Sequence, residues 1–197
     1  MLYRVVYLVG RFIFRIMGLS SEGIENLPAE GPVIIAANHV SNWDPIVVGL
    51  MINRPVHFMG KAELFNNQLL GTLLLKLNAF PVKRGAADRK AIRTALERLQ
   101  QGNVLGIFPE GARNKTGEDL KPQLGVAMLA LKSGAPIVPV ACVGTDCRFP
   151  FGWFRPLRVI VGEPILTAEG MQKKVSSAEM SNLSEEIMLK INLLLSK

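Results

Sequence analysis

Near its beginning the chain passes from an apolar run to a helix start through one short turn. Residues 32–37 are all apolar, and a run of this length is typical of a buried strand. The octapeptide NHVSNWDP follows at 38–45. Asp44 followed by Pro45 is typical of a helix start, with Asp as the N-cap and Pro at the first helical position. The pattern predicts a strand, a turn and a helix that ends near Asn53.

The turn carries two side chains that can act together, His39 and Asp44. On one continuous helix they would lie about 140° apart, but a turn can fold the carboxylate back onto the imidazole. Such a pairing fixes the tautomer and stabilises the imidazolium, as a general base requires. A helix cap beside an unrelated surface histidine explains the same eight residues equally well. The octapeptide alone leaves both interpretations open.

Two more motifs follow downstream, one at the end of an apolar run and one within another. Residues 108–113 read FPEGAR, and Gly111 permits a backbone conformation in which Glu110 and Arg113 turn toward one pocket. Arginine offers a planar fork of donors that suits a phosphate. Residues 138–140 read VPV, and Pro139 indicates a strand at an edge, at a bulge or at a terminal position.

Predicted strands and helices alternate along the rest of the chain. The expected strands after the first turn are 56–59, 79–84 (ending in two cations), 104–108, 137–143 and 157–161. The expected helices are 88–101, 123–133 and one starting with a capping box at Ser176 and Glu179. This alternation predicts an α/β fold with a mixed, largely parallel sheet flanked by helices. His57 falls inside a predicted strand and is interpreted as structural.

Composition limits the classes of function. The length of 197 residues suits one domain, and the net charge of +7 favours an anionic partner: nucleic acid, acidic lipid or a phosphorylated substrate. Cys142, Cys147 and two histidines predict neither a disulfide framework nor a metal site. The glycine-rich nucleotide motifs and Gly-x-Ser-x-Gly are absent from the sequence.

The first 19 residues predict an amphipathic helix. Arg4, Arg11 and Arg15 share one narrow face at 100° per residue, and apolar side chains fill the rest. A spanning helix would carry such charges at about 2.5–3.5 kcal/mol each near the bilayer centre, and the pattern does not suit a signal peptide. We expect residues 1–22 to form a membrane-interface helix preceding a domain of residues 23–197. An ordinary helix packed on the domain is the alternative, and the leucine-rich segment 64–77 could be core or a second membrane contact.

The three motifs, in this order and at these intervals, resemble those of the glycerolipid acyltransferases, especially the short bacterial 1-acyl-sn-glycerol-3-phosphate acyltransferases. The resemblance covers residues 24–165, and Ala112 departs from the Ser or Thr usual at its position. It implies transfer of an acyl chain from acyl-CoA or acyl carrier protein to the free hydroxyl of a lysophospholipid. Phosphatidic acid is the expected product, no cofactor is implied, and no nucleic acid partner is expected.

The same resemblance assigns roles to individual residues. His39 is expected to be the general base, oriented by Asp44. Arg84 matches a position that holds the acceptor phosphate, although a solvated basic turn also explains Lys83-Arg84. Phosphate binding is further expected at Glu110, Gly111 and Arg113, and acyl or structural support at Pro139.

The sequence leaves several other functions open. The acceptor could be glycerol 3-phosphate or another lysolipid, a lipid or phosphate-ester hydrolase could use the same His–Asp pair on water, and a non-catalytic membrane module would need none of these side chains. The expected location is the cytoplasmic face of the cell membrane, on an anionic surface, as a peripheral or monotopic protein.

Overall fold

The computed structural model describes residues 2–83, 88–114, 122–146, 157–167 and 175–197. The elements in chain order are α1 (Leu2–Ile16), β1 (Leu19–Glu22), η1 (Ile24–Asn26), β2 (Val33–Ala37), α2 (Asp44–Met51), β3 (Val56–Lys61), η2 (Ala62–Phe65), α3 (Gln68–Lys76), β4 (Phe80–Val82), α4 (Arg89–Gln100), β5 (Val104–Ile107), α5 (Gly125–Ser133), β6 (Ile137–Val143), β7 (Leu157–Val161) and α6 (Ser177–Leu195).

The strands form one sheet in the order β1-β7-β6-β2-β5-β3-β4. Every neighbouring pair is parallel except β6 and β7, which are antiparallel. The expectation of an α/β fold with a mixed, largely parallel sheet is therefore confirmed. Among the described residues, no helix has the length and apolar character needed to cross a bilayer.

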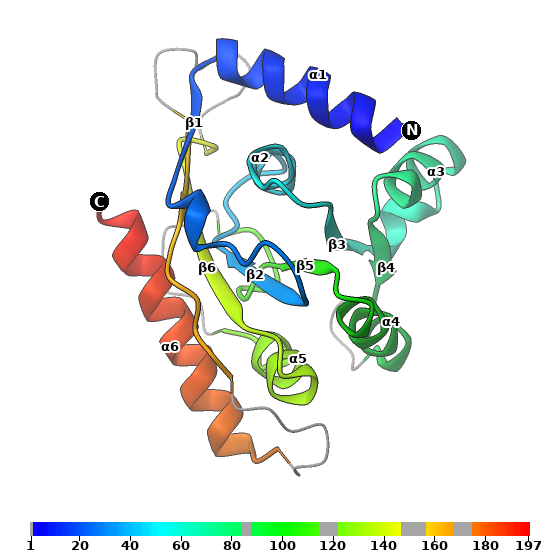
Figure 1. Ribbon diagram of the computed structural model, residues 1–197. Helices are drawn as coiled ribbons and strands as arrows, with labels where there is room; N and C mark the ends of the chain where they lie inside the picture. Colours follow the sequence, from blue (N-terminus) through cyan, green and yellow to red (C-terminus); the bar gives the residue numbers. More distant parts are fainter. Residues whose placement is uncertain (1, 84–87, 115–121, 147–156, 168–174) are drawn as a thin grey trace.

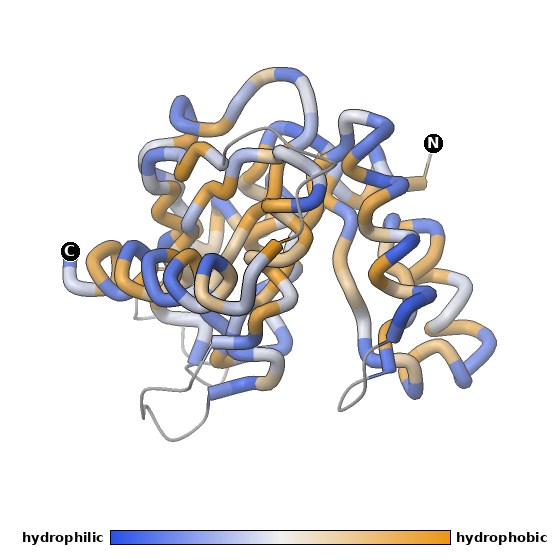
Figure 2. Tube along the Cα trace, turned by 90° about the horizontal axis from the view of Figure 1, so that it is seen from below, coloured by the Kyte–Doolittle hydropathy of each residue, from blue (hydrophilic) through white to orange (hydrophobic). Residues whose placement is uncertain are grey.

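Helices cover both faces of the sheet (Figure 1). The face with α1 and α2 is filled by residues such as Val33, Ile35 and Val48, while the face with α4, α5 and α6 is filled by Ile34, Leu105 and others. Alternate residues of β2 thus enter opposite cores, as the period of two in a strand requires. The central strands are mostly apolar in Figure 2, whereas α6 alternates polar and apolar residues, because only one side of that helix is buried.

Two helices begin with the capping residues that the sequence predicts. The Asp88 side chain accepts hydrogen bonds from the N–H groups of Lys90 and Ala91 and caps α4. Ser176 and Glu179 form both bonds of a capping box at the start of α6. The N-terminal helix is shorter than the segment 1–22 that we assigned to it, because it ends at Ile16 and residues 19–22 form β1 beside β7.

Pro139 is not on an edge strand. It lies in β6, which is paired on one side with β2 and on the other with β7. Ile137 pairs with Ile165, and Val140 pairs with Val161, so the four residues 137–140 of β6 lie opposite the five residues 161–165. The extra residue makes this a bulge, where a missing backbone N–H is tolerated. Of the three positions expected for this proline, the bulge is therefore the one observed.

The N-terminal helix packs on the domain with one narrow face and leaves a wide apolar face uncovered. Phe14 is buried against the core, while the opposite side exposes eight large apolar side chains: Leu2, Val5, Val6, Leu8, Val9, Phe12, Ile13 and Ile16. Arg4 and Arg15 are exposed on its flank, but the Arg11 guanidinium donates to Asn53 Oδ1 at 2.8 Å and to the Tyr7 hydroxyl. The helix packs on the domain, as one alternative expected, and its exposed apolar face leaves contact with a membrane as a prediction.

The leucine-rich segment is largely exposed. It forms η2 and α3, and Leu69 is 85% exposed, with Leu70, Leu73 and Leu75 also exposed. Of the helix, only Gly71 is buried. This segment is therefore not part of the core.

Candidate active site

The site lies where two neighbouring parallel strands end. His39 follows β2, which ends at Ala37, and Glu110 follows β5, which ends at Ile107. Carboxyl ends of adjacent parallel strands meet at one edge of a sheet, and loops there commonly bear ligand sites. The pairing of β2 with β5 therefore brings the first two sequence motifs together (Figure 1).

His39 and Asp44 form a buried pair. His39 Nδ1 lies 2.8 Å from Asp44 Oδ2, and the two residues are 7% and 0% exposed. The same carboxylate oxygen accepts the N–H groups of Val40 and Ser41, each at 2.7 Å. With a proton on Nδ1 facing the carboxylate, Nε2 carries the free lone pair that can accept a proton from a hydroxyl.

This arrangement corrects two expectations drawn from the octapeptide. His39 is not a surface histidine, because the turn carries its ring into the protein. Asp44 is not an N-cap either: Trp43 holds that position, Asp44 begins α2, and no side chain caps the helix. The carboxylate faces backward to the turn that precedes it, where three donors converge on one oxygen. The aspartate therefore organises the turn rather than the helix end.

Glu110 holds the backbone of His39. Its Oε1 accepts the His39 N–H at 3.1 Å, and the N–H of Asn114 donates to the His39 carbonyl at 2.6 Å. Burial raises the pKa of the Glu110 carboxyl, an effect that the His39 N–H partly offsets. The 108–114 loop thus holds the turn by hydrogen bonds to both the N–H and the carbonyl of His39.

Gly111 and Arg113 complete the described part of that loop. Gly111 has φ +70°, a left-handed conformation that other residues adopt at a cost, and a Cβ there would lie 2.9 Å from Gln123 Cγ. Arg113 is exposed, so its guanidinium can meet a solvent-borne anion. Glu110 and Arg113 therefore do not share a side: Glu110 is buried against the turn that bears His39, whereas Arg113 is exposed.

Two residues that shape the site, Asn38 and Phe108, were not predicted from the sequence. The Asn38 side chain donates to the Cys142 carbonyl at 3.1 Å and accepts the Cys142 N–H at 2.7 Å, which joins the end of β2 to β6. The Phe108 ring stacks on His39 with centroids 4.1 Å apart and on Phe58 at 6.0 Å. Both residues stand inside the quoted motifs, and their place beside His39 and Glu110 was the available signal.

Two further residues that the sequence singled out lie elsewhere, and a third, Arg84, falls outside the described residues. The neighbours of Pro139, Val138 and Val140, belong to the core beside α2, so Pro139 faces the other side of the sheet and supports structure away from His39. His57 is buried in β3, and burial together with Arg98 lowers its pKa.

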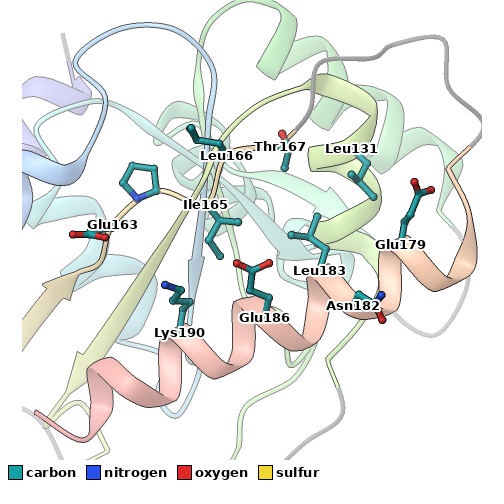
Figure 3. A pocket seen from close by; sticks show the side chains of 11 residues that line it. Leu131, Glu163, Ile165, Leu166, Thr167, Glu179, Asn182, Leu183, Glu186 and Lys190 are labelled. Carbon is teal, nitrogen blue, oxygen red and sulfur yellow. The ribbon is translucent and has the colours of Figure 1, made fainter.

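An open cleft lies between α6 and the segment 163–167 (Figure 3). Glu163, Glu186 and Lys190 project from its walls, and Ile165 at its floor pairs with Ile137 at the start of β6. The start of β6 lies at the amino ends of the parallel strands, whereas His39 follows the carboxyl end of β2. The cleft and His39 are therefore at opposite ends of these strands. None of the candidate site residues lines this cleft, and we assign it no part in the chemistry.

Known proteins share this architecture. Residues 18–143 match the family model described as Acyltransferase. A 1-acyl-sn-glycerol-3-phosphate acyltransferase of Bacillus subtilis is 37% identical over 147 residues, which are 74% of this chain and 72% of that protein. A lyso-ornithine lipid O-acyltransferase of Pseudomonas aeruginosa is 38% identical over 112 residues, 56% of this chain and 42% of that protein.

The fold has a counterpart among solved structures. The crystal structure of the 1-acyl-sn-glycerophosphate (LPA) acyltransferase PlsC from Thermotoga maritima matches with a TM-score of 0.74 and 28% identity, covering 98% of this chain and 78% of that one. These likenesses confirm the resemblance that the three motifs indicated.

Proposed function

This chain belongs to the acyltransferase family, and we propose that it moves a fatty acyl chain from an acyl thioester to the free hydroxyl of 1-acyl-glycerol 3-phosphate. The product is phosphatidic acid, an intermediate of phospholipid synthesis. The observation that carries this proposal is the buried His39–Asp44 pair, with Nδ1 held at 2.8 Å and Nε2 left to act as a base.

The reaction needs no nucleophilic side chain. His39 Nε2 takes the proton as the acceptor hydroxyl attacks the thioester carbonyl, and a carbon–oxygen bond forms. The carbon–sulfur bond then breaks, and the proton passes from His39 to the leaving thiolate. Asp44 stabilises the imidazolium that exists between these two steps and keeps the ring in the required orientation. The donor is a thioester of coenzyme A or of acyl carrier protein, and the chemistry requires no cofactor.

The acceptor phosphate is held beside the 108–114 loop. Arg113 is exposed and presents its guanidinium fork. Arg84, which lies outside the described residues, is the second cation that we assign to this phosphate. Gly111 shapes the loop through its left-handed backbone. Glu110 serves this pocket indirectly. Its carboxyl accepts the backbone N–H of His39 and does not contact the phosphate.

A second acceptor class has one observation in its favour. The relative named as a lyso-ornithine lipid O-acyltransferase is as similar, over its aligned residues, as the relative named for 1-acyl-glycerol 3-phosphate. An acyl chain passed to the hydroxyl of another lysolipid would use the same base. The two acceptors differ in charge, so the requirement for Arg113 separates them.

The apolar face of α1 provides the membrane contact. Eight exposed apolar side chains face away from the domain, and Arg4 and Arg15 flank them where lipid phosphates lie. We place the protein on the cytoplasmic face of the cell membrane as a peripheral or monotopic enzyme, where donor and acceptor both occur.

An assay of the purified protein tests the proposal. Donors are acyl-CoA and acyl carrier protein thioesters, and acceptors are 1-acyl-glycerol 3-phosphate, glycerol 3-phosphate and a phosphate-free lysolipid. We expect phosphatidic acid from the first acceptor and free thiol in equal amount. Release of free fatty acid without acylated product would identify a hydrolase and overturn the proposal.

A further inference from the structure

Helix α1 packs against helix α2 and contacts residues at both of its ends. The Phe14 ring lies 5.9 Å from the Trp43 ring at the start of α2. A Cβ on Gly10 would lie 2.8 Å from Leu50 Cδ2, so α1 approaches closely the last turn of α2. Arg11 donates to Asn53 Oδ1 at 2.8 Å, just beyond the end of α2.

The first of these contacts adjoins the catalytic pair. Trp43 immediately precedes Asp44, and its carbonyl accepts the N–H groups of Ile46 and Val47, both at 2.9 Å. Its own N–H donates to Ser41 Oγ at 3.3 Å, and the Ser41 N–H donates to Asp44 Oδ2 at 2.7 Å. A shift of Trp43 therefore moves both the first turn of α2 and the carboxylate that orients His39.

Two phenylalanines of α1 have opposite surroundings. Phe14 is 9% exposed and touches Trp43, whereas Phe12 is 67% exposed on the apolar face that points away from the domain. The outward face suits a bilayer, and the inward face is fitted to α2, because a Cβ on Gly10 would displace the Leu50 side chain. The helix thus has two separate surfaces, and only one of them leads to the site.

We propose that α1 braces the catalytic turn, and that Phe14 and Trp43 are positioning residues that act on His39 through Asp44. This inference rests on the proposed function only in using acyl transfer as one readout. It separates two roles of the helix, since bracing does not require a membrane and anchoring does not require Phe14.

Kinetics on monomeric substrates test the brace. The wild-type protein and the variants Phe14→Ala, Phe14→Leu and Phe12→Ala are assayed without vesicles, with a short-chain acyl-CoA and a water-soluble short-chain acceptor that the wild type turns over. We expect Phe14→Ala to lower kcat roughly 10- to 100-fold with both KM values within twofold, because small displacements of a base cost rate. Phe14→Leu should recover part of the loss, and Phe12→Ala should lower only binding to anionic vesicles.

Two controls separate positioning from loss of stability. Ile191→Ala removes a fully buried side chain of α6 on the other face of the sheet and should lower Tm at least as much without lowering kcat. In a double-mutant cycle, Phe14→Ala added to Trp43→Ala should cost little further rate if both act through one contact. Additive losses, or an equal kcat loss in Ile191→Ala, would refute the brace.

A spectroscopic readout stands apart from activity. The chain has two histidines, so ring proton and nitrogen signals of His39 can be followed by NMR with His57 as an internal reference. We expect Phe14→Ala to shift or broaden the Nδ1–H signal of the bond to Asp44 while His57 stays unchanged, and Phe12→Ala to alter neither. An unchanged His39 signal in Phe14→Ala overturns the brace even if the protein proves to catalyse another reaction, whereas a shifted signal without acyl transfer overturns only the proposed function.

Discussion

Glu110 Oε1 accepts the backbone N–H of His39 at 3.1 Å, across 71 residues of sequence. The bond makes the second motif a support for the first, because His39, the proposed base, is held by its main chain as well as by the bond from its ring to Asp44. A general base must be kept within about 0.5 Å of its productive position, and side chains around it supply that restraint. The site is therefore one interlocked unit built on two adjacent strand ends.

Replacing the catalytic pair should remove acyl transfer. We expect His39→Ala to lower kcat by about 10²–10⁴-fold, the usual contribution of a positioned acid or base. Asp44→Asn should lower kcat as well, and also Tm, because the Asp44 carboxylate holds three donors. Steady-state kinetics and thermal unfolding measure both. The control His57→Gln changes the other buried histidine, and kcat values for His39→Ala within a few-fold of wild type would contradict the assignment.

Glu110 should matter as an acceptor rather than as a charge. Glu110→Gln keeps an oxygen for the His39 N–H, so kcat should fall only a few-fold. Glu110→Ala leaves that buried N–H unpaired, at a cost of roughly 1–3 kcal/mol in the free energy of unfolding, and kcat should fall much further. Equal kcat in the two variants would show that this hydrogen bond does not support the base.

The same residue predicts a pH dependence of stability. Burial raises the folded-state pKa of Glu110 above its ordinary value of 4.5, so the folded protein binds the proton more tightly than the unfolded chain. The contribution of Glu110 to the free energy of unfolding is therefore full below pH 4.5 and is lost as the pH rises through its folded-state pKa. The free energy of unfolding of wild type relative to Glu110→Gln should fall across that window. A difference that grows with pH in denaturant titrations would contradict the raised pKa.

Gly111→Ala should destabilise the loop. The left-handed backbone costs an alanine roughly 1–2 kcal/mol, and the new methyl also crowds Gln123. We expect a matching loss in the free energy of unfolding and a lower kcat, because Glu110 precedes the strained residue. Gly125→Ala is the control: this glycine begins α5 with open space around it, so alanine there should be neutral or stabilising.

Arg113→Lys tests the phosphate contact. Lysine keeps the charge and loses the planar fork, so the KM for 1-acyl-glycerol 3-phosphate should rise several-fold while the KM for the thioester stays within twofold. With a phosphate-free lysolipid the substitution should have little effect. If both KM values rise together, Arg113 supports the loop instead of the acceptor.

Membrane binding should depend on two of the three arginines of α1. Arg4→Gln with Arg15→Gln should weaken binding to anionic vesicles at low salt, since each cation contributes on the order of 1 kcal/mol near such a surface. Arg11→Gln should instead lower Tm, because its guanidinium is bonded to Asn53 and Tyr7. Co-sedimentation at low and high salt and thermal unfolding measure the two effects. If Arg11→Gln weakens vesicle binding as much as the double variant does, the separate role of Arg11 is contradicted.

Local sequence was sufficient for features that depend on a few neighbouring residues. The caps at Asp88 and Ser176, the strand at 33–37 and the alternation that predicts a largely parallel sheet all follow from short-range geometry and hydrophobic burial. The His39–Asp44 pair was also accessible as one of two interpretations, because five residues in a turn already limit how far apart the side chains can lie.

Tertiary structure decided everything that depends on which strands become neighbours. Glu110 reaches His39 only because β5 pairs with β2, and Pro139 stands at a bulge inside the sheet because β7 returns antiparallel to β6. Arg11 shares a helix face with Arg4 and Arg15 in sequence, yet the approach of α2 gives it a partner in Asn53 that the other two lack among the contacts of the described residues. Sequence spacing specifies directions along one element, whereas contacts between elements follow from how their apolar faces are buried together.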